Sequence, residues 1–363
     1  MTRARAGLLA RACVAIALLS AALVGGEVLV GRDLLPQFYP RNEAFGRALR
    51  ALTIPRWNPY CENGASWFGP RTGGVLYPGY ALFALLPLAR AMAAFVALHY
   101  LLAMEGARRL VGEERPGAPA FAAALVYGCG GFLTSQYWAL PYLVSGALLP
   151  WALLGGLVAG RGRGALGAAG VALATGGMNL AGEPQGALAS AALAVVLAAV
   201  AGRTRGVAWA CAGVGAGALL AAPQLLSLLD ELPRTNRAMQ QFGDLRWHLA
   251  PAAHAADLVA PGLLGELAIG RGAYWGGAAW GGELPWCGVG LGALGLAAAA
   301  TALARPRAWT PGERFAVGLA LLGLLLASST VSDALRLRFP AKWLVLPALG
   351  LAWLAGAGVA RWR

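Results

Sequence analysis

The sequence predicts an all-α, polytopic membrane protein, and three observations lead to that fold class. Hydrophobic residues make up 58% of the 363 residues and charged residues only 12%, whereas about a quarter of an ordinary soluble domain is charged. Apolar runs of roughly 17–25 residues, the length of a membrane-crossing helix, recur along the chain. None of these runs alternates between polar and apolar residues as a strand would. We therefore expect a single transmembrane domain over residues 1–363.

The charges are distributed as in a membrane protein. The formal net charge is +13, but the arginines lie in the short connections between apolar runs, where cytoplasmic loops carry them. This arrangement argues against nucleic acid as a partner and for membrane lipids. The pairs are Arg108 and Arg109, Arg161 and Arg163, Arg203 and Arg205, Arg305 and Arg307, and Arg361 and Arg363.

The first apolar run covers residues 12–30 and follows Arg3, Arg5 and Arg11. A cleaved signal peptide has the same order of charged and apolar residues. The run is long for a signal peptide, which favours a retained first helix with its N-terminus in the cytoplasm. We expect further helices over 88–104, 118–135, 139–159, 165–181, 185–202, 207–229, 285–304, 313–331 and 342–360, which makes about ten in all.

Counted alternately, these helices place two long loops on the extracytoplasmic side, at residues 31–87 and 230–284. In the first loop, Asn42 suits the N-cap of a helix that runs to about residue 52. One face of that helix is apolar, so we expect it to lie in the membrane interface. A second interfacial or re-entrant segment is expected over 75–87. The apolar face comprises Phe45, Ala48, Leu49 and Leu52.

The five cysteines, at positions 13, 61, 129, 211 and 287, have no metal-ligand spacing. Only Cys61 and Cys287 fall in or near the predicted outer loops. A disulfide between them and two free thiols both agree with the sequence, and free thiols are the simpler interpretation.

Asp33 follows the first apolar run directly. A carboxylate at that depth is close enough to the apolar phase for its pKa to be raised, and close enough to water to accept a proton. It is therefore a candidate general base. The alternative is an ordinary interfacial carboxylate paired with Arg32.

Glu183 and Gln185 lie in the segment NLAGEPQG, a tight turn between two predicted helices. Pro184 suits the first position of a helix, which places Glu183 at a helix N-terminus, where partial positive charge favours an ionised carboxylate. A capping role explains Glu183 fully. Gln185 begins an apolar helix, and we expect its amide to find a partner inside the bundle.

Aromatic and histidine side chains have competing interpretations. The aromatic residues of the first loop are typical of a belt at the membrane surface, but they lie among many turn formers, and stacking on a sugar ring is the alternative. His99 is predicted to be a packing residue inside a helix. His248 and His254 lack a third ligand for zinc. The aromatic residues are Trp57, Tyr60, Trp67 and Tyr77.

The segment 332–343 breaks the expected charge pattern, because it is a short outer connection that carries Arg336, Arg338 and Lys342. The positive-inside rule predicts few Lys and Arg residues in a short outer connection. An anionic ligand such as a lipid phosphate and contact with anionic headgroups explain it equally well.

Several stretches in order resemble the YfhO-like bacterial membrane proteins, a branch of the GT-C superfamily of glycosyltransferases. The resemblance runs from about residue 31 to the end of the chain. Each motif alone is weak, but their ordered set is fairly specific. The matching stretches are GRDLLPQFYP, PRWNPYCENGASWFG, GVLYPGY, GCGGFLTSQYWALPYLVSGALLPW, GEPQG, PQLLSLLDELPRTNR and LRFPAKW with the helix that follows it.

The resemblance implies a transferase in the bacterial cytoplasmic membrane that uses a polyprenyl-phosphate-linked sugar at the outer face. A lipid or a cell-envelope glycan or protein would be the acceptor. By analogy, Asp33 would deprotonate the acceptor hydroxyl, and Arg338 and Lys342 would hold the phosphate. No cofactor is assigned, and a divalent metal ion, Mg²⁺ or Mn²⁺, agrees with the chemistry. The residues expected to shape the sugar site are Trp57, Asn58, Pro59, Tyr60 and Glu62, with Glu183 and Gln185 nearby.

Two departures from the family pattern keep other functions open. Glu183 stands where relatives often have histidine, and relatives continue with more helices, so a short form, a fragment or an inactive paralogue is an alternative. A transporter or flippase for a lipid-linked glycan would use the same anionic-lipid chemistry but would have broken or charged helices at mid-membrane. A non-catalytic scaffold is the third hypothesis.

Overall fold

The structure is a computed structural model that describes most of the chain. The described residues are 7, 10, 11, 13–15, 17, 19–31, 33–58, 64–68, 74–202, 204–234, 290–328, 331 and 340–362. The chain divides into two compact units. Unit 1 comprises Met1–Leu102 and Trp138–Phe242, and unit 2 comprises Ala103–Tyr137 and Gly243–Arg363.

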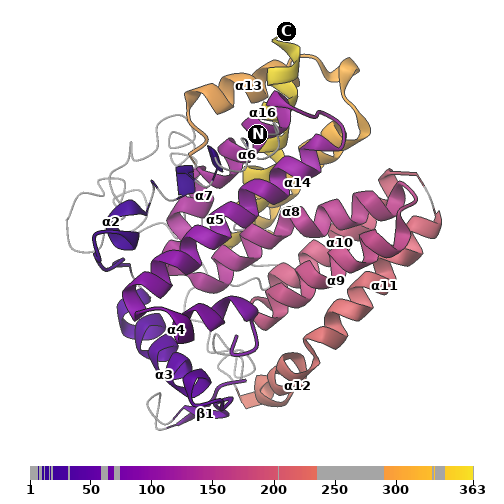
Figure 1. The fold of residues 1–363 in the computed structure, drawn as a ribbon. Coiled ribbons are helices and arrows are strands. Elements are labelled where there is room, and N and C mark those ends of the chain that lie inside the picture. Colours follow the sequence, from indigo (N-terminus) through magenta and orange to yellow (C-terminus); the bar gives the residue numbers. More distant parts are fainter. Residues whose placement is uncertain are drawn as a thin grey trace. The chain divides into compact units, whose positions relative to one another are not determined.

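Unit 1 combines a folded first loop with a set of long helices (Figure 1). Its N-terminal part contains α2 (Ser20–Leu23), the π-helical turn η1 (Leu34–Phe38), α3 (Tyr39–Arg50), a hairpin of β1 (Trp57–Asn58) and β2 (Ala65–Ser66), η2 (Pro78–Ala81), α4 (Leu82–Leu85) and the first part of α5 (Leu88–Gly112). The later part contains α8 (Leu140–Gly160), α9 (Gly164–Leu180), α10 (Pro184–Val200), α11 (Thr204–Leu220), α12 (Ala222–Glu231) and η4 (Leu232–Arg234).

Unit 2 is built around its last helix. It contains the end of α5, α6 (Ala118–Gly128), α7 (Gly131–Ser135), the turn η3 (Gln136–Trp138) at its boundary, α13 (Ala293–Leu303), η8 (Pro306–Ala308), α14 (Pro311–Ala327), η9 (Pro340–Leu344) and α16 (Val345–Arg361). Helix α16 packs against α6, α13 and α14. Trp353 in α16 is fully buried, and a Cβ atom at Gly358 would collide with the Ala298 carbonyl of α13.

Among the residues that the structure describes, four helical segments are long and apolar enough to cross a membrane by length and composition: Leu88–Gly112, Ala118–Trp138, Leu140–Gly160 and Ala341–Arg361. A fifth span results if α11 and α12, which meet at a bend of 70°, form one broken crossing. These segments support the predicted helical membrane protein. The figure of about ten spans stays a prediction.

The first predicted helix is shorter than the apolar run that predicted it. The run continues to residue 30, but α2 ends at Leu23, and residues 26–31 are not helical. Gly25 and Gly26 explain the end of the helix, because Gly26 adopts a φ of 74° that residues with a Cβ atom disfavour. Asp33 therefore does not follow helix one directly.

The helices of unit 1 approach closely because small residues face one another. A Cβ atom at Gly156 in α8 would lie 2.1 Å from the Ala194 carbonyl oxygen of α10, a contact typical of helix pairs in membranes. Left-handed glycines end α8, α9 and α10 and reverse the chain. These are Gly162, Gly182 and Gly202, with φ of 95°, 93° and 104°.

The first loop docks on one end of this helical set. Helix α3 begins at Tyr39 rather than at the predicted cap Asn42, since Pro40 occupies its first turn. Gly46 lets α3 approach α4, because a Cβ atom there would lie 2.2 Å from the Phe83 carbonyl oxygen. Arg50 Nη1 donates to the same oxygen at 3.1 Å. The predicted segment over residues 75–87 contains η2 and α4, and α4 ends before Pro87.

Candidate functional site

A cluster of aromatic rings fixes residues 74–86 of the first loop to α5. Tyr80 stacks on Phe95 of α5 with 5.2 Å between ring centroids, and Tyr77 meets Phe95 edge-on at 6.2 Å. Phe83 packs against the same ring at 5.9 Å. All four side chains are at least nine-tenths buried. These contacts make the loop a packed part of unit 1.

His99 completes the cluster and confirms the prediction of a packing residue. Its ring is fully buried. Nδ1 lies 2.6 Å from the Phe95 carbonyl oxygen, and because a carbonyl only accepts, Nδ1 carries the hydrogen. Nε2 then accepts a hydrogen bond from the Tyr77 hydroxyl at 2.7 Å. Both ring nitrogens are used inside the protein, which leaves none for a ligand.

A positive charge lies between two aromatic side chains of the loop. The Arg41 guanidinium carbon lies 5.8 Å from the centroid of the Trp67 ring and 5.7 Å from that of Tyr80. Gly74, with a φ of +122°, allows this approach, since a Cβ atom there would lie 3.3 Å from both Arg41 Nη2 and the Ala181 carbonyl oxygen. Arg41 therefore lies at the end of unit 1 where α9 turns into α10.

One buried polar atom on each of Asn42, Tyr80 and Gln224 lacks a hydrogen-bond partner in the described part of the chain. These atoms are Asn42 Nδ2, Tyr80 Oη and Gln224 Oε1; the exposed fractions of these three residues are 1%, 1% and 4%. The Gln224 amide does bind the loop, since Nε2 donates to the Phe68 carbonyl oxygen at 3.0 Å. An unpaired buried polar atom costs about 1–3 kcal/mol. A hydroxyl- or phosphate-bearing ligand, or water, would remove that cost.

The Tyr80 hydroxyl can act as a neutral hydrogen-bond donor. Burial raises the pKa of Tyr80, and nearby Arg41 opposes that shift only in part. Burial also raises the pKa of Tyr77. Both phenols therefore keep their protons at neutral pH. The Tyr77 hydrogen is already donated to His99 Nε2, so the hydrogen-bond donors of this set come from Tyr80, Arg41 and Asn42. Such a set suits oxygen-rich, electron-rich ligands.

Asp33 lies at the start of this folded loop. It is the N-cap residue of η1, where its backbone carbonyl accepts the N–H groups of Gln37 and Phe38, each at 3.1 Å. Its side chain does not cap the helix, and the residue is partly exposed. The alternative pairing with Arg32 lies outside the described residues. Asp33 and Arg41 stand on one nearly continuous helical segment, η1 followed by α3.

Trp57 and Asn58 form the first strand of the hairpin, with Trp57 opposite Ser66 and Asn58 opposite Ala65. The Trp57 indole lies over Gly64, where a Cβ atom would be 2.4 Å from Cζ2, and 60% of the residue is exposed. The hairpin thus presents one aromatic face outward. Trp67 and Tyr77, by contrast, are buried, so the interpretation of these two as a surface belt is wrong.

Glu183 caps α10 as the sequence predicts. Its carboxylate accepts the Gly186 N–H at 3.3 Å, and Pro184 occupies the first turn. The residue is only 7% exposed. Gln185 is partly buried in the first turn of α10. Both residues lie at the same end of unit 1 as the Gly74–Ala181 contact.

Lys342 belongs to unit 2, in η9. Its ammonium nitrogen lies 5.2 Å from the centroid of the neighbouring Trp343 ring, which is a cation–π contact. Arg338, Tyr60 and Glu62 lie outside the described residues, as do most of the predicted loop 230–284 and the cysteine pair Cys61 and Cys287. Within the described ranges, no group of three or more His, Cys, Asp or Glu side chains is arranged to hold a metal ion.

The sequence did not identify Arg41 or Gln224 as site residues, and it did not predict that the Asn42 side chain is buried. Arg41 and Asn42 follow Pro40 at the beginning of an amphipathic segment, and two polar residues on the apolar side of such a helix are a signal for a buried polar site. Gln224 carries a similar signal, because it follows Pro223 at the start of a largely apolar helix. Their convergence depends on tertiary contacts.

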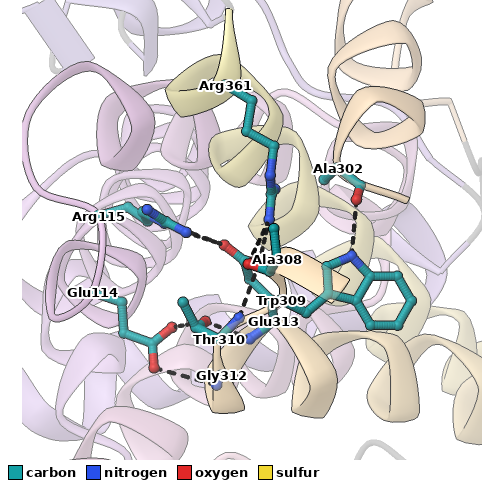
Figure 2. Close-up of polar contacts among 9 residues, drawn as sticks. All are labelled: Glu114, Arg115, Ala302, Ala308, Trp309, Thr310, Gly312, Glu313 and Arg361. Atoms are coloured by element: carbon teal, nitrogen blue, oxygen red, sulfur yellow. Dashed lines mark hydrogen bonds and ion pairs between the residues drawn. The ribbon is translucent and has the colours of Figure 1, made fainter. Parts of the chain in front are cut away.

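A second polar network lies in unit 2, where α14 begins and α16 ends. Figure 2 shows the fully buried Glu313 carboxylate between Arg115 and Arg361, which bind it at 3.0 Å and 2.5 Å. Thr310 caps α14 by accepting the Glu313 N–H and donates its hydroxyl hydrogen to Glu114 at 2.6 Å. Glu114 also accepts the Gly312 N–H at 3.2 Å. This network ties three separate segments of unit 2 together.

Comparison with known proteins gives no relative from which a function could be transferred. No model of a known protein family matches the chain, and the search of curated proteins finds no match.

Proposed function

We propose that the chain is a membrane glycosyltransferase that moves a sugar from a polyprenyl-phosphate-linked donor to an acceptor at the outer face of the bacterial cytoplasmic membrane. One observation carries the proposal. A carboxylate (Asp33), a guanidinium group between aromatic rings (Arg41) and an exposed indole (Trp57) all belong to one folded loop at one end of a set of apolar helices.

The reaction needs a base, an aromatic surface and hydrogen-bond donors for phosphate. Asp33 would take the proton of the acceptor hydroxyl as its oxygen attacks the anomeric carbon of the sugar. The bond from that carbon to the phosphate oxygen breaks, and polyprenyl phosphate leaves with the electron pair. Positive charge and hydrogen-bond donors offset the charge that develops on the leaving oxygen.

The residues of the loop divide these tasks. Trp57 would stack on the sugar, with Asn58, Tyr60 and Glu62 beside it. The phosphate-binding role that the resemblance gives to Arg338 and Lys342, which belong to unit 2, stays a prediction. The unpartnered donors Asn42 Nδ2 and Tyr80 Oη support a binding site for an oxygen-rich ligand in the same loop.

Release of polyprenyl phosphate tests the proposal without knowledge of the acceptor. Purified protein in vesicles is incubated with synthetic polyprenyl-phosphate hexose or pentose and a membrane extract as a source of acceptors. We expect wild-type protein to release polyprenyl phosphate and Asp33→Asn to be slower by roughly 10²–10⁴, with donor binding retained.

Glu43→Gln is the matched control, because Glu43 is a carboxylate of the same loop that pairs with Arg47 at 3.7 Å. Its rate should stay close to wild type. Wild-type release by Asp33→Asn would place the base elsewhere, with Glu62 and Glu183 the next residues to test. Loss of donor binding in Asp33→Asn would make Asp33 a structural part of the site.

A flippase for a lipid-linked glycan is the second candidate, and the 70° bend between α11 and α12 favours it, since interrupted helices are common in transporters. The same vesicles separate the two functions. A flippase would move a labelled lipid-linked sugar across the bilayer and release no polyprenyl phosphate. A non-catalytic scaffold would do neither.

A further inference from the structure

We propose that unit 2 carries a binding site for the headgroup of an anionic phospholipid. The site is the arginine edge, which we define as Arg305, Arg307, Arg314, Trp309 and Trp362. These residues lie at the end of α13, in η8, in the first turn of α14 and directly after α16. Trp309 is one of the residues drawn in Figure 2, and Arg314 follows Glu313 of that network directly in the sequence.

The three arginines of the edge present positive charge that no carboxylate in the described parts of the chain neutralises. Arg305, Arg307 and Arg314 are exposed, and none of them forms an ion pair there. The neighbouring carboxylates are already engaged inside the protein. Glu313 binds Arg115 and Arg361, and Glu114 binds Thr310 and the Gly312 N–H. The edge therefore has charge complementary to a phosphate group.

The two tryptophans give the edge an apolar component. Trp309 Nε1 donates to the Ala302 carbonyl oxygen at 2.8 Å, and Trp362 Nε1 donates to the Thr301 hydroxyl at 3.1 Å. Both indoles are thus held at the last turn of α13. Trp362 is 53% exposed and Leu303 is 40% exposed. Exposed apolar surface beside exposed arginines fits an amphiphile, with acyl chains on one side and an anionic headgroup on the other.

The buried network around Glu313 orders part of the arginine edge before a ligand binds. The capping box of Thr310 and Glu313 fixes the start of α14, and Arg361 donates to the Ala308 carbonyl oxygen at 3.3 Å. The turn that carries Arg307 and Trp309 is consequently held at both ends. A turn ordered in advance loses less conformational entropy when it binds a ligand.

A lipid explains this combination better than a soluble anion. A free phosphate would use the arginines but not the exposed Leu303 and Trp362. The edge also lies at the end of α16, part of a segment with the length and hydropathy of a membrane span, where headgroups are found.

Thermal unfolding in detergent with added lipid tests the site. The probes are phosphatidylglycerol, phosphatidylcholine as the neutral lipid, and glycerol phosphate and inorganic phosphate as soluble anions. Phosphatidylglycerol alone should raise the unfolding temperature of the wild-type chain in a concentration-dependent way, because a ligand that binds the folded state stabilises it. In the triple variant Arg305→Gln, Arg307→Gln and Arg314→Gln, the apparent affinity should fall by on the order of 100-fold.

The matched control carries the same three substitutions at the arginines of unit 1, Arg161→Gln, Arg163→Gln and Arg205→Gln. It should keep the full response to phosphatidylglycerol. The single variant Arg307→Gln, with an intermediate loss, replaces the triple variant if the latter fails to fold. An equal loss in the control would mean general attraction to anionic lipid and would overturn the site, as would a full response in the variants of the edge. An equal response to inorganic phosphate would assign the edge to a soluble anion instead.

Discussion

At the scale of single residues, two of the buried tyrosines of the first loop, Tyr77 and Tyr80, differ in their hydrogen bonds. The Tyr77 hydroxyl donates to His99 Nε2 at 2.7 Å, whereas the Tyr80 hydroxyl has no partner among the described residues. Both rings pack in the same aromatic cluster. We therefore expect the Tyr77 hydroxyl to contribute to stability and the Tyr80 hydroxyl to contribute to ligand binding.

Removal of the two hydroxyl groups should have opposite consequences. Tyr77→Phe leaves a fully buried imidazole nitrogen unpaired and should destabilise the protein by about 1–3 kcal/mol. Tyr80→Phe removes an unpaired polar atom and should leave stability unchanged or slightly higher, while it weakens binding of the polyprenyl-phosphate donor. Unfolding temperature in detergent measures the first effect, and donor binding measures the second. A large loss of stability in Tyr80→Phe would mean that its hydroxyl has an internal partner.

At the scale of secondary-structure elements, glycines decide how closely helices and loops approach. Gly46 is the contact between α3 and α4, where a Cβ atom would lie 2.2 Å from the Phe83 carbonyl oxygen. Gly215 in α11 has no atom within 4 Å of the position that its Cβ atom would take. Both residues lie inside helices, so the difference between them comes from packing alone.

Alanine at these two glycines should therefore act in opposite directions. Gly46→Ala must push α3 away from backbone atoms that cannot give way, which should lower the unfolding temperature and the rate of transfer together. Gly215→Ala should be neutral or stabilising by about 1 kcal/mol, because alanine is the better helix former. Thermal unfolding and release of polyprenyl phosphate measure both variants. A Gly46→Ala protein with normal stability and rate would show that the first loop does not depend on close α3–α4 packing.

At the scale of the whole molecule, the arrangement of unit 1 makes a prediction about sidedness. The first loop contacts the α9–α10 turn through Gly74 and Ala181 and contacts α12 through Gln224. The turns that follow α8 and α10, at residues 161–163 and 201–202, lie at the opposite ends of those helices. If the helices of unit 1 cross the membrane, the two sets of residues must lie on opposite sides.

Cysteine labelling in intact cells tests this arrangement in a background without the five native cysteines. A membrane-impermeant thiol reagent should label Thr53→Cys and Asp230→Cys from outside. Arg163→Cys and Arg205→Cys should react only after the membrane is permeabilised. Labelling of position 163 together with position 53 from outside would overturn the topology and the proposed site with it.

The candidate site was predictable from the sequence in part. Asp33 and Glu183 were recognisable because each stands at a boundary between an apolar run and a polar turn, and Trp57 because it lies among turn formers. Asn42 was predicted to be an N-cap residue, but it is a buried residue inside α3. An asparagine that caps a helix and one that is buried inside it look alike in the sequence, and only the position at which the helix begins distinguishes them. Arg41 and Gln224 were missed, since the contacts that bring them to Trp67 and Phe68 join segments far apart in the chain.

The sequence by itself determined the helical membrane class, the first loop as a separate structural feature and the cap at Glu183. Each of these depends on local composition and on spacing within one segment, which hydrophobicity and backbone geometry control directly. The tertiary structure decided that α2 stops at Leu23, that Trp67 and Tyr77 are buried, and that Glu313 binds arginines 198 and 48 residues away. Packing between distant segments decides these features, and a linear pattern of residue types does not contain that information.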